Sequence, residues 1–163
     1  MAYVHFRVKP GTAAGIGQFY REMFGAEVKE IGGTEGCSAV EGDDADRGGV
    51  AGVLVRVGPT QHLGFLEGGE TLPEYDGHHI CVYLSDEGFR RSFEEAERRG
   101  IVFVNPRPNF GKADTLEKAL DEQQYRIKDI IDPVSGKRLH ELEHEIRSVS
   151  HPSYPVGRDL SVE

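Results

Sequence analysis

The two halves of this chain repeat one order of short segments. The first half opens with the alternating stretch YVHFRV around His5, continues into QFYREMFG, where apolar side chains recur at helical spacing, and stops at Gly25. The second half runs through HHICVYL around His79 and SFEEAERRG to a stop at Gly100. Each half therefore reads as strand, helix, glycine stop and strand. A unit this long that occurs only twice excludes a solenoid and predicts a duplicated βαβββ module.

We expect one domain over residues 1–147, made of a first module at 2–67 and a second at 78–146. The predicted strands are 2–8, 27–31, 49–57 and 61–67 in the first module and 79–84, 101–104, 125–131 and 138–146 in the second. The predicted helices begin near Thr12 and Glu87, and a short third helix is expected within 105–122. The polar tail at 148–163 is expected to lie extended over the surface or over a partner subunit.

Composition limits the class of partner. With 163 residues, of which 37% are hydrophobic, the chain can bury one substantial core. Its net charge of −9 opposes binding to phosphate backbones, so no nucleic-acid partner is expected. No apolar run is long enough to span a bilayer, and no basic segment precedes an apolar one at the N-terminus, so a cytoplasmic protein with no membrane partner is expected. Cys37 and Cys81 are too few for a disulfide scaffold and lack the spacing of structural zinc.

Four segments in a fixed order resemble one known family. They are VHFRV followed by QFYREMFGAEV, QHLGFLE after the turn Gly58-Pro59, DGHHICVYL, and DPVSG before a final acidic strand. Together they resemble the vicinal oxygen chelate superfamily, which includes glyoxalase I, extradiol dioxygenases and bleomycin-resistance proteins, over about residues 2–146. The resemblance implies an α+β fold in which two tandem βαβββ modules form a curved, partly closed mixed sheet with helices outside. It also implies a metal site whose ligands come from the first and fourth strands of each module.

Two histidines match the first-strand ligand positions of that family. They are His5 and His79, and strand alternation alone already places both on the face that does not pack against a helix. A single strand histidine is more often a satisfied polar residue than a ligand, so the repeated position carries the metal hypothesis. The candidate substrate-binding side chains share this face, or else fill the interior of the barrel: Tyr3, Arg7, Cys81 and Tyr83.

The last predicted strand offers the carboxylate ligand. If Leu142 faces the helix, then Glu141, Glu143 and Glu145 all lie on the opposite face. Glu143 is our first choice because it is central in the strand, and Glu141 is the alternative because the family's acid commonly lies near the turn. A solvated acidic strand is the competing interpretation.

The matching strand of the first module offers no ligand at its centre. Leu63 and Phe65 should pack, which leaves Gly64 where a glyoxalase-like enzyme would have Glu or Gln. Two histidines and one carboxylate with open coordination positions suit non-haem Fe(II), which is favoured ahead of Zn, Mn or Ni. The expected function is an extradiol-type dioxygenase, or a related lyase or isomerase, acting on a small oxygen-chelating substrate. A metal-free resistance-type binding protein is the alternative, and a homodimer is expected, with the site formed within one chain or across the dimer.

A second motif competes with this interpretation. The segment from His140 to His144 spells HExxH, which on a helix would bind zinc with Glu141 as the base of a hydrolase. On a strand the two histidines share a face but lie about 13 Å apart, too far to bind one ion. The turn before the segment predicts a strand, so a zinc hydrolase is a minor alternative.

Overall fold

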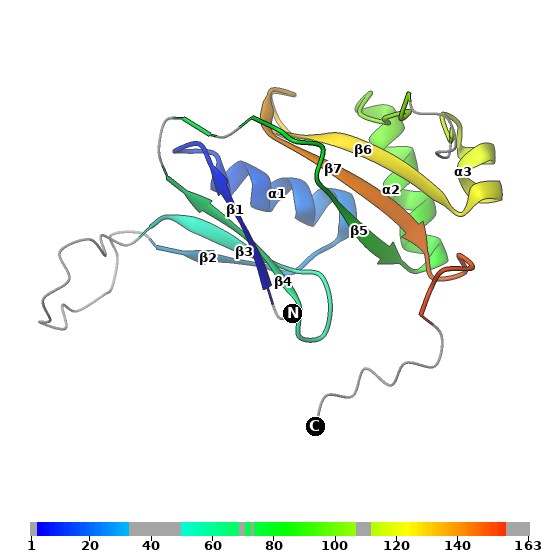
Figure 1. The fold of residues 1–163 in the computed structure, drawn as a ribbon, viewed down its shortest axis with the longest axis horizontal. Coiled ribbons are helices and arrows are strands. Elements are labelled where there is room, and N and C mark those ends of the chain that lie inside the picture. The colour runs from blue at the N-terminus through cyan, green and yellow to red at the C-terminus, as the bar shows by residue number, and fades with distance from the viewer. Residues whose placement is uncertain (1–2, 33–49, 69–70, 73, 107–111, 156–163) are drawn as a thin grey trace, which may run out of the picture. The chain divides into compact units, whose positions relative to one another are not determined.

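The computed structural model describes residues 3–32, 50–68, 71–72, 74–106 and 112–155 (Figure 1). Cys37 therefore lies outside the described residues. The chain divides into two compact units. The first consists of Met1–Asp76 and Asp129–Leu142, and the second of Gly77–Lys128 and Glu143–Glu163. The last two strands of the chain thus contribute residues to both units.

The first unit contains a four-stranded sheet and one helix. Its elements are β1 (Tyr3–Val8), α1 (Ala13–Phe24), β2 (Val28–Ile31), β3 (Gly52–Arg56) and β4 (His62–Glu67). The sheet order is β1-β4-β3-β2, in which β1 runs parallel to β4 and the other neighbours are antiparallel. This order is the predicted βαβββ module.

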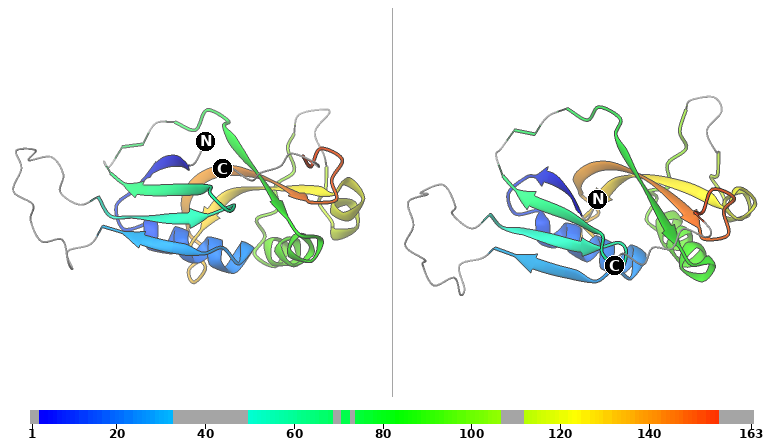
Figure 2. Two further views of the ribbon diagram at one scale, coloured as in Figure 1. Left: turned by 90° about the horizontal axis from the view of Figure 1, so that it is seen from below. Right: turned by 60° about the horizontal axis from the view of Figure 1, so that its bottom comes forward.

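Helix α1 covers one face of that sheet (Figure 2). Its apolar stripe of Ile16, Phe19, Tyr20 and Met23 is almost completely buried, as the helical spacing predicted. The helix ends at Gly25, whose φ of 64° is left-handed and whose N–H bonds to the carbonyl of Arg21.

The second unit repeats the arrangement. Its elements are β5 (His79–Leu84), α2 (Asp86–Arg98), α3 (Leu116–Glu122), β6 (Gln124–Ile131) and β7 (Arg138–Ser148), of which β6 and β7 extend into the first unit. The sheet order is β5-β7-β6, with β5 parallel to β7. The strand expected at 101–104 is reduced to one antiparallel bridge between Val102 and Ile127. This bridge lies beside β6 as β2 lies beside β3, so both sheets follow the same order and the duplicated α+β fold is confirmed.

Aromatic packing joins α2 to its sheet. Phe89 and Phe93 each meet the ring of Tyr125 edge to face, with centroids 5.3 and 5.0 Å apart. The hydroxyl of Tyr125 donates to Oγ of Ser92 at 2.8 Å, and burial raises the Tyr125 pKa above its ordinary value. Leu142 on β7 is fully buried, so its neighbour Glu143 faces away from the helices.

The predicted turn between β6 and β7 is present and packs on α1. Oδ1 of Asp132 accepts the backbone N–H and the hydroxyl of Ser135 and the backbone N–H of Val134, and these bonds lower the pKa of this carboxyl. A Cβ on Gly15 of α1 would come within 2.8 Å of Cδ1 of Leu139, so the helix lies directly on this hairpin. None of the helices in the described parts of the chain has the length and apolar character needed to cross a membrane.

Candidate metal centre

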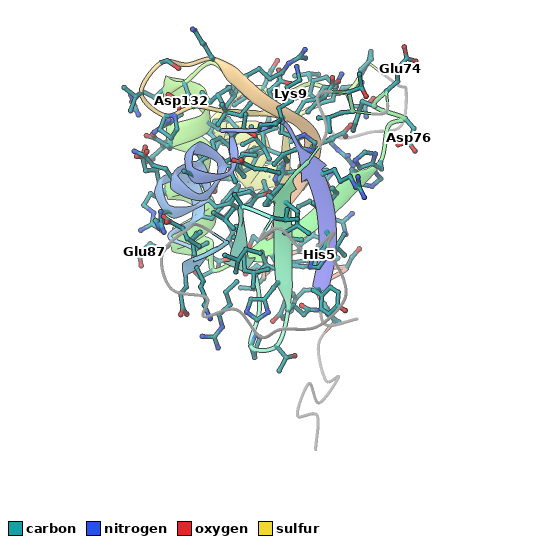
Figure 3. The ribbon with its side chains drawn as sticks, turned by 90° about the vertical axis from the view of Figure 1, so that its left-hand side faces the viewer. His5, Lys9, Glu74, Asp76, Glu87 and Asp132 are labelled. Carbon is teal, nitrogen blue, oxygen red and sulfur yellow. The ribbon has the colours of Figure 1, made fainter. Side chains whose placement is uncertain are left out.

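The imidazole of His5 lies over Gly64, on the face of the first sheet that is opposite α1. The two residues are register partners on β1 and β4, and Figure 3 shows His5 on β1. A Cβ built on Gly64 would lie 2.3 Å from Cδ2 and 3.0 Å from Nε2 of the His5 imidazole. Glycine at this position therefore leaves the space that the ring occupies. We call this side, on both sheets, the helix-free face.

The neighbours of His5 follow the predicted alternation. Tyr3, 62% exposed, stacks on the imidazole with ring centroids 4.7 Å apart, and Arg7 is also exposed. Phe6 points to the other side and stacks on Phe65 at 5.4 Å. Three side chains of β1 that the sequence assigned to a site are thus on one exposed face.

Glu67, at the end of β4, faces the helix instead. Its Oε1 accepts the backbone N–H of Ala13 at 2.9 Å, so the carboxylate serves the N-terminus of α1. The register partner of His5 on β4 is thus a glycine and not a carboxylate.

The second sheet carries a histidine and a carboxylate at the matching positions. His79 on β5 is the register partner of Glu143 on β7, as His5 is the partner of Gly64. Partners on neighbouring parallel strands point to the same face. The pairing of β5 with β7 begins at Glu143, so Glu141 lies before the paired part of β7. The register therefore favours Glu143 over Glu141 as the neighbour of His79.

The acidic face of β7 is buried and paired. Glu143 and Glu145 are only 7% and 5% exposed, because β7 is the central strand of its sheet. Arg126 of β6 reaches both: Nη1 donates to Oε1 of Glu143, and Nη2 donates to Oε2 of Glu145. The interpretation as a solvated acidic strand is therefore wrong.

Sequence reasoning missed Arg126. Alternation along β6 places it on the side opposite Tyr125, which packs on α2, and hence on the face that carries Glu143 and Glu145. An arginine inside a buried strand, followed by a turn and an acidic strand, was the available signal. A buried arginine requires paired partners.

The ionic contacts continue from β7 to the C-terminal segment. Arg147 pairs through Nη2 with Glu145 and donates through Nη1 to the hydroxyl of Tyr83 at 3.2 Å. That hydroxyl in turn donates to the carbonyl of Ser153 at 3.1 Å, and the ring of Tyr83 meets that of Tyr154 edge to face at 5.1 Å. Tyr83, a predicted substrate-binding residue, is thus partly covered by residues of the tail.

Cys81 lies between His79 and Tyr83 on β5 and is an exposed free thiol. Desolvation raises the pKa of this thiol, and the nearby charge of Arg147 offsets part of that rise. The shift keeps more of the thiol protonated near neutral pH.

The HExxH segment lies on strand β7. His144 is fully buried, and His140 packs near the rings of Phe6 and Phe65 with centroids 6.2 and 6.3 Å away. A strand cannot bring the two histidines to one ion as a helix would. The zinc-hydrolase alternative is therefore wrong.

Within the described part of the chain, no group of three or more His, Cys, Asp and Glu side chains lies together as a metal site. The candidate donors are His5 in the first unit and the pair formed by His79 and Glu143 in the second. Each unit thus presents part of the predicted ligand set on its helix-free face.

Comparison with known proteins identifies the fold. No protein-family model and no curated protein matches the chain. A mutant of the fosfomycin resistance protein FosX from Listeria monocytogenes, complexed with Mn(II) and 1S,2S-dihydroxypropylphosphonic acid, has a TM-score of 0.52 at 15% identity over 90% of both chains. FosX from Mesorhizobium loti has a TM-score of 0.50 at 16% identity over 90% of this chain and 89% of that one. The oxidase ChaP-H2 has a TM-score of 0.50 at 15% identity over 94% and 98%. The chain shares the fold of these proteins, in agreement with the α+β fold that the resemblance implied.

Proposed function

We propose that this protein is a metal-dependent enzyme of the vicinal oxygen chelate type, with His5, His79 and Glu143 as ligands of one divalent ion. The observation that carries the proposal is the matching place of the two histidines in the sheets. His5 and His79 each lie on an edge strand that runs parallel to the last strand of its module, and the register partner of the second histidine is a carboxylate. The small substrate is held through two neighbouring oxygen atoms.

The two imidazoles and one carboxylate are donors suited to a divalent metal ion. His79 is exposed, and its register partner Glu143 comes from the next strand on the same face, where one ion would meet both. Gly64 leaves the room in which the His5 imidazole lies. The Mn(II) bound in the FosX structure supports a divalent ion. Two imidazoles and one carboxylate leave open positions for oxygen ligands, which is why we favour Fe(II).

When bound, the ion holds and polarises the substrate's oxygen atoms. The chain's own residues supply binding and orientation around it. Arg7 is exposed on the face of His5 and pairs with an anionic group of the substrate, while Tyr3 and Cys81 contribute to the surrounding surface. We propose extradiol-type ring cleavage first and a related lyase or isomerase reaction second.

Metal content tests the proposal directly. Protein purified without oxygen, or reconstituted with Fe(II), should contain close to one divalent ion per chain. His5→Ala, His79→Ala and Glu143→Gln should each lose it, whereas His78→Ala, beside His79 on the same chain segment, should retain it. If the native protein neither contains nor accepts a divalent ion, the enzyme hypothesis is wrong. A metal-loaded protein that turns over no catechol in air excludes only the dioxygenase.

A metal-free binding protein is the second candidate. The observation in its favour is that Arg126 and Arg147 together balance the charges of Glu143 and Glu145 without any ion. In that case the wild-type protein and Glu143→Gln should bind a small-molecule ligand equally well in the presence of a chelator.

We also propose that the protein is a homodimer. A mixture of two ligand variants tests whether the metal ligands of one site come from one chain or from both. His5→Ala and Glu143→Gln proteins are unfolded together, refolded and loaded with metal. Recovery of metal binding means that the donors come from two chains, because a mixed dimer then contains one complete set. Absence of recovery means that each chain supplies its own set.

A further inference from the structure

Arg126 lies on the flank of Glu143 that is opposite His79. The sheet order β5-β7-β6 puts β7 between the other two strands, so His79 of β5 and Arg126 of β6 approach Glu143 from its two sides. Nη1 of Arg126 bonds to Oε1 of Glu143. The carboxylate is thus fixed from one side by a donor on a neighbouring strand.

The environment of Arg126 is unusual for a residue that only adds stability. Its side chain is 7% exposed, and those of Glu143 and Glu145 are 10% and 7% exposed. Removing these charges from water costs free energy that their attraction only partly repays, so a buried ion pair is weak evidence of a stabilising role. A buried arginine bonded to two carboxylates is nevertheless an effective orienting device, because its planar donors fix the direction of each carboxylate.

The charges along this row alternate in sign. Glu143 pairs with Arg126, Arg126 with Glu145, and Glu145 with Arg147, so two acids balance two bases. Arg126 therefore keeps a partner in Glu145 when Glu143 also serves another cation. The row does not have to rearrange when Glu143 becomes a ligand.

We infer that Arg126 is the positioning residue that orients the Glu143 carboxylate toward the ion bound by His79, an inference that rests on the proposed metal centre. Groups that hydrogen-bond a metal ligand set its direction, and removing one typically weakens metal binding about 10- to 100-fold. Arg126→Met, which replaces the unbranched stem of the side chain but removes its charge and its donors, should therefore weaken Mn(II) binding by about that factor. Arg126→Lys, which keeps one charged donor, should recover part of the loss.

The experiment is a titration with Mn(II) in which electron paramagnetic resonance reports free ion and the line shape of bound ion. The control is Arg56→Met, the same change in the exposed pair of Arg56 with Glu27. We expect wild type and control to bind alike, Glu143→Gln to lose the site, and Arg126→Met to bind weakly with an altered line shape while circular dichroism shows it folded. If Arg126→Met does not fold, Arg126→Lys decides, and an affinity below that of wild type supports the inference.

The outcomes of this titration separate the role of Arg126 from the existence of the metal centre. If wild type and Glu143→Gln behave as expected but the Arg126 variants bind Mn(II) as wild type does, or more tightly, only the inference is wrong. If wild type and Arg56→Met bind no Mn(II), the proposed metal centre is wrong and the inference falls with it.

Discussion

Gly64 has little tolerance for a side chain, because the His5 imidazole occupies the place where its Cβ would lie. We expect Gly64→Ala to push the imidazole aside and to weaken divalent-metal binding at least about tenfold, as displacement of a ligand does. The ring is exposed and can rotate, so the loss in unfolding free energy should stay near the low end of overpacking, about 1 kcal/mol. Metal titration and urea unfolding measure the two effects. Gly68→Ala is the control, since a Cβ there meets nothing within 4 Å; equal metal affinity in both variants would contradict the prediction.

Individual site residues differed in how far the sequence could reveal them. Strand alternation assigned His5 and His79 to exposed faces, because the direction of a strand side chain depends only on local geometry. The partner of Glu143 could not be assigned in that way. Its contact with Arg126 depends on the register between β6 and β7, which is a property of two strands and their turn.

At the scale of elements, strand β4 stabilises helix α1 through Glu67. The side chain of Thr12 forms no cap, and the first turn of α1 has no acidic residue, so the Glu67 carboxylate bonded to Ala13 takes that role. Glu67→Gln should cost about 0.5–1 kcal/mol of unfolding free energy by removing the charge, and Glu67→Ala about 1–2 kcal/mol. Thermal unfolding measures both. Glu30→Gln on the exposed side of β2 is the control, and a loss as large as that of Glu67→Gln would refute the role.

Helix α2 carries a pH-dependent contribution through Glu95. Hydrogen bonds from Arg98 and then Arg99 lower the pKa of Glu95 from 4.5 to about 2. A carboxyl whose pKa is lower in the folded protein stabilises it above the unfolded pKa, and this stability is lost as pH falls from about 4.5 toward 2. Solvent screening limits the effect to about 1 kcal/mol. Urea unfolding of wild type and Glu95→Gln should differ by this amount at pH 6 and by much less at pH 3, whereas Glu94→Gln should show no such trend.

Helices and strands were predictable where the hydrophobic pattern ran over many residues, and less so where it covered only a few. The apolar residues of α1 predicted a clear helical period, and the six buried positions of the helix confirm it. The apolar stretch at 101–104 was expected to be a strand, but only Val102 forms a bridge. The stretch lies between the left-handed Gly100 and Pro106, and a proline has no N–H with which to continue a strand ladder.

The duplication was the property of the whole molecule that the sequence revealed best. Two similar segment orders predicted two modules, and the sheet orders β1-β4-β3-β2 and β5-β7-β6 show them. The boundaries of the compact units were not visible in the sequence. Residues Asp129–Leu142 follow the second module in the chain but belong to the first unit. Their hairpin packs on α1 at Gly15. Such packing depends on tertiary contacts between segments far apart in the chain.

Metal binding should stabilise the whole chain if both modules supply ligands. An ion that binds only the folded state adds about 2.7 kcal/mol at a concentration 100 times its Kd. For a protein of this size, that corresponds to a rise in Tm of about 5–10 °C. Differential scanning calorimetry with Mn(II) should show this rise in wild type and in the control His78→Ala. It should be absent from His5→Ala as well as from His79→Ala, because one ligand of three is missing in each. A rise that survives in His5→Ala but not in His79→Ala would place the ion in the second module alone.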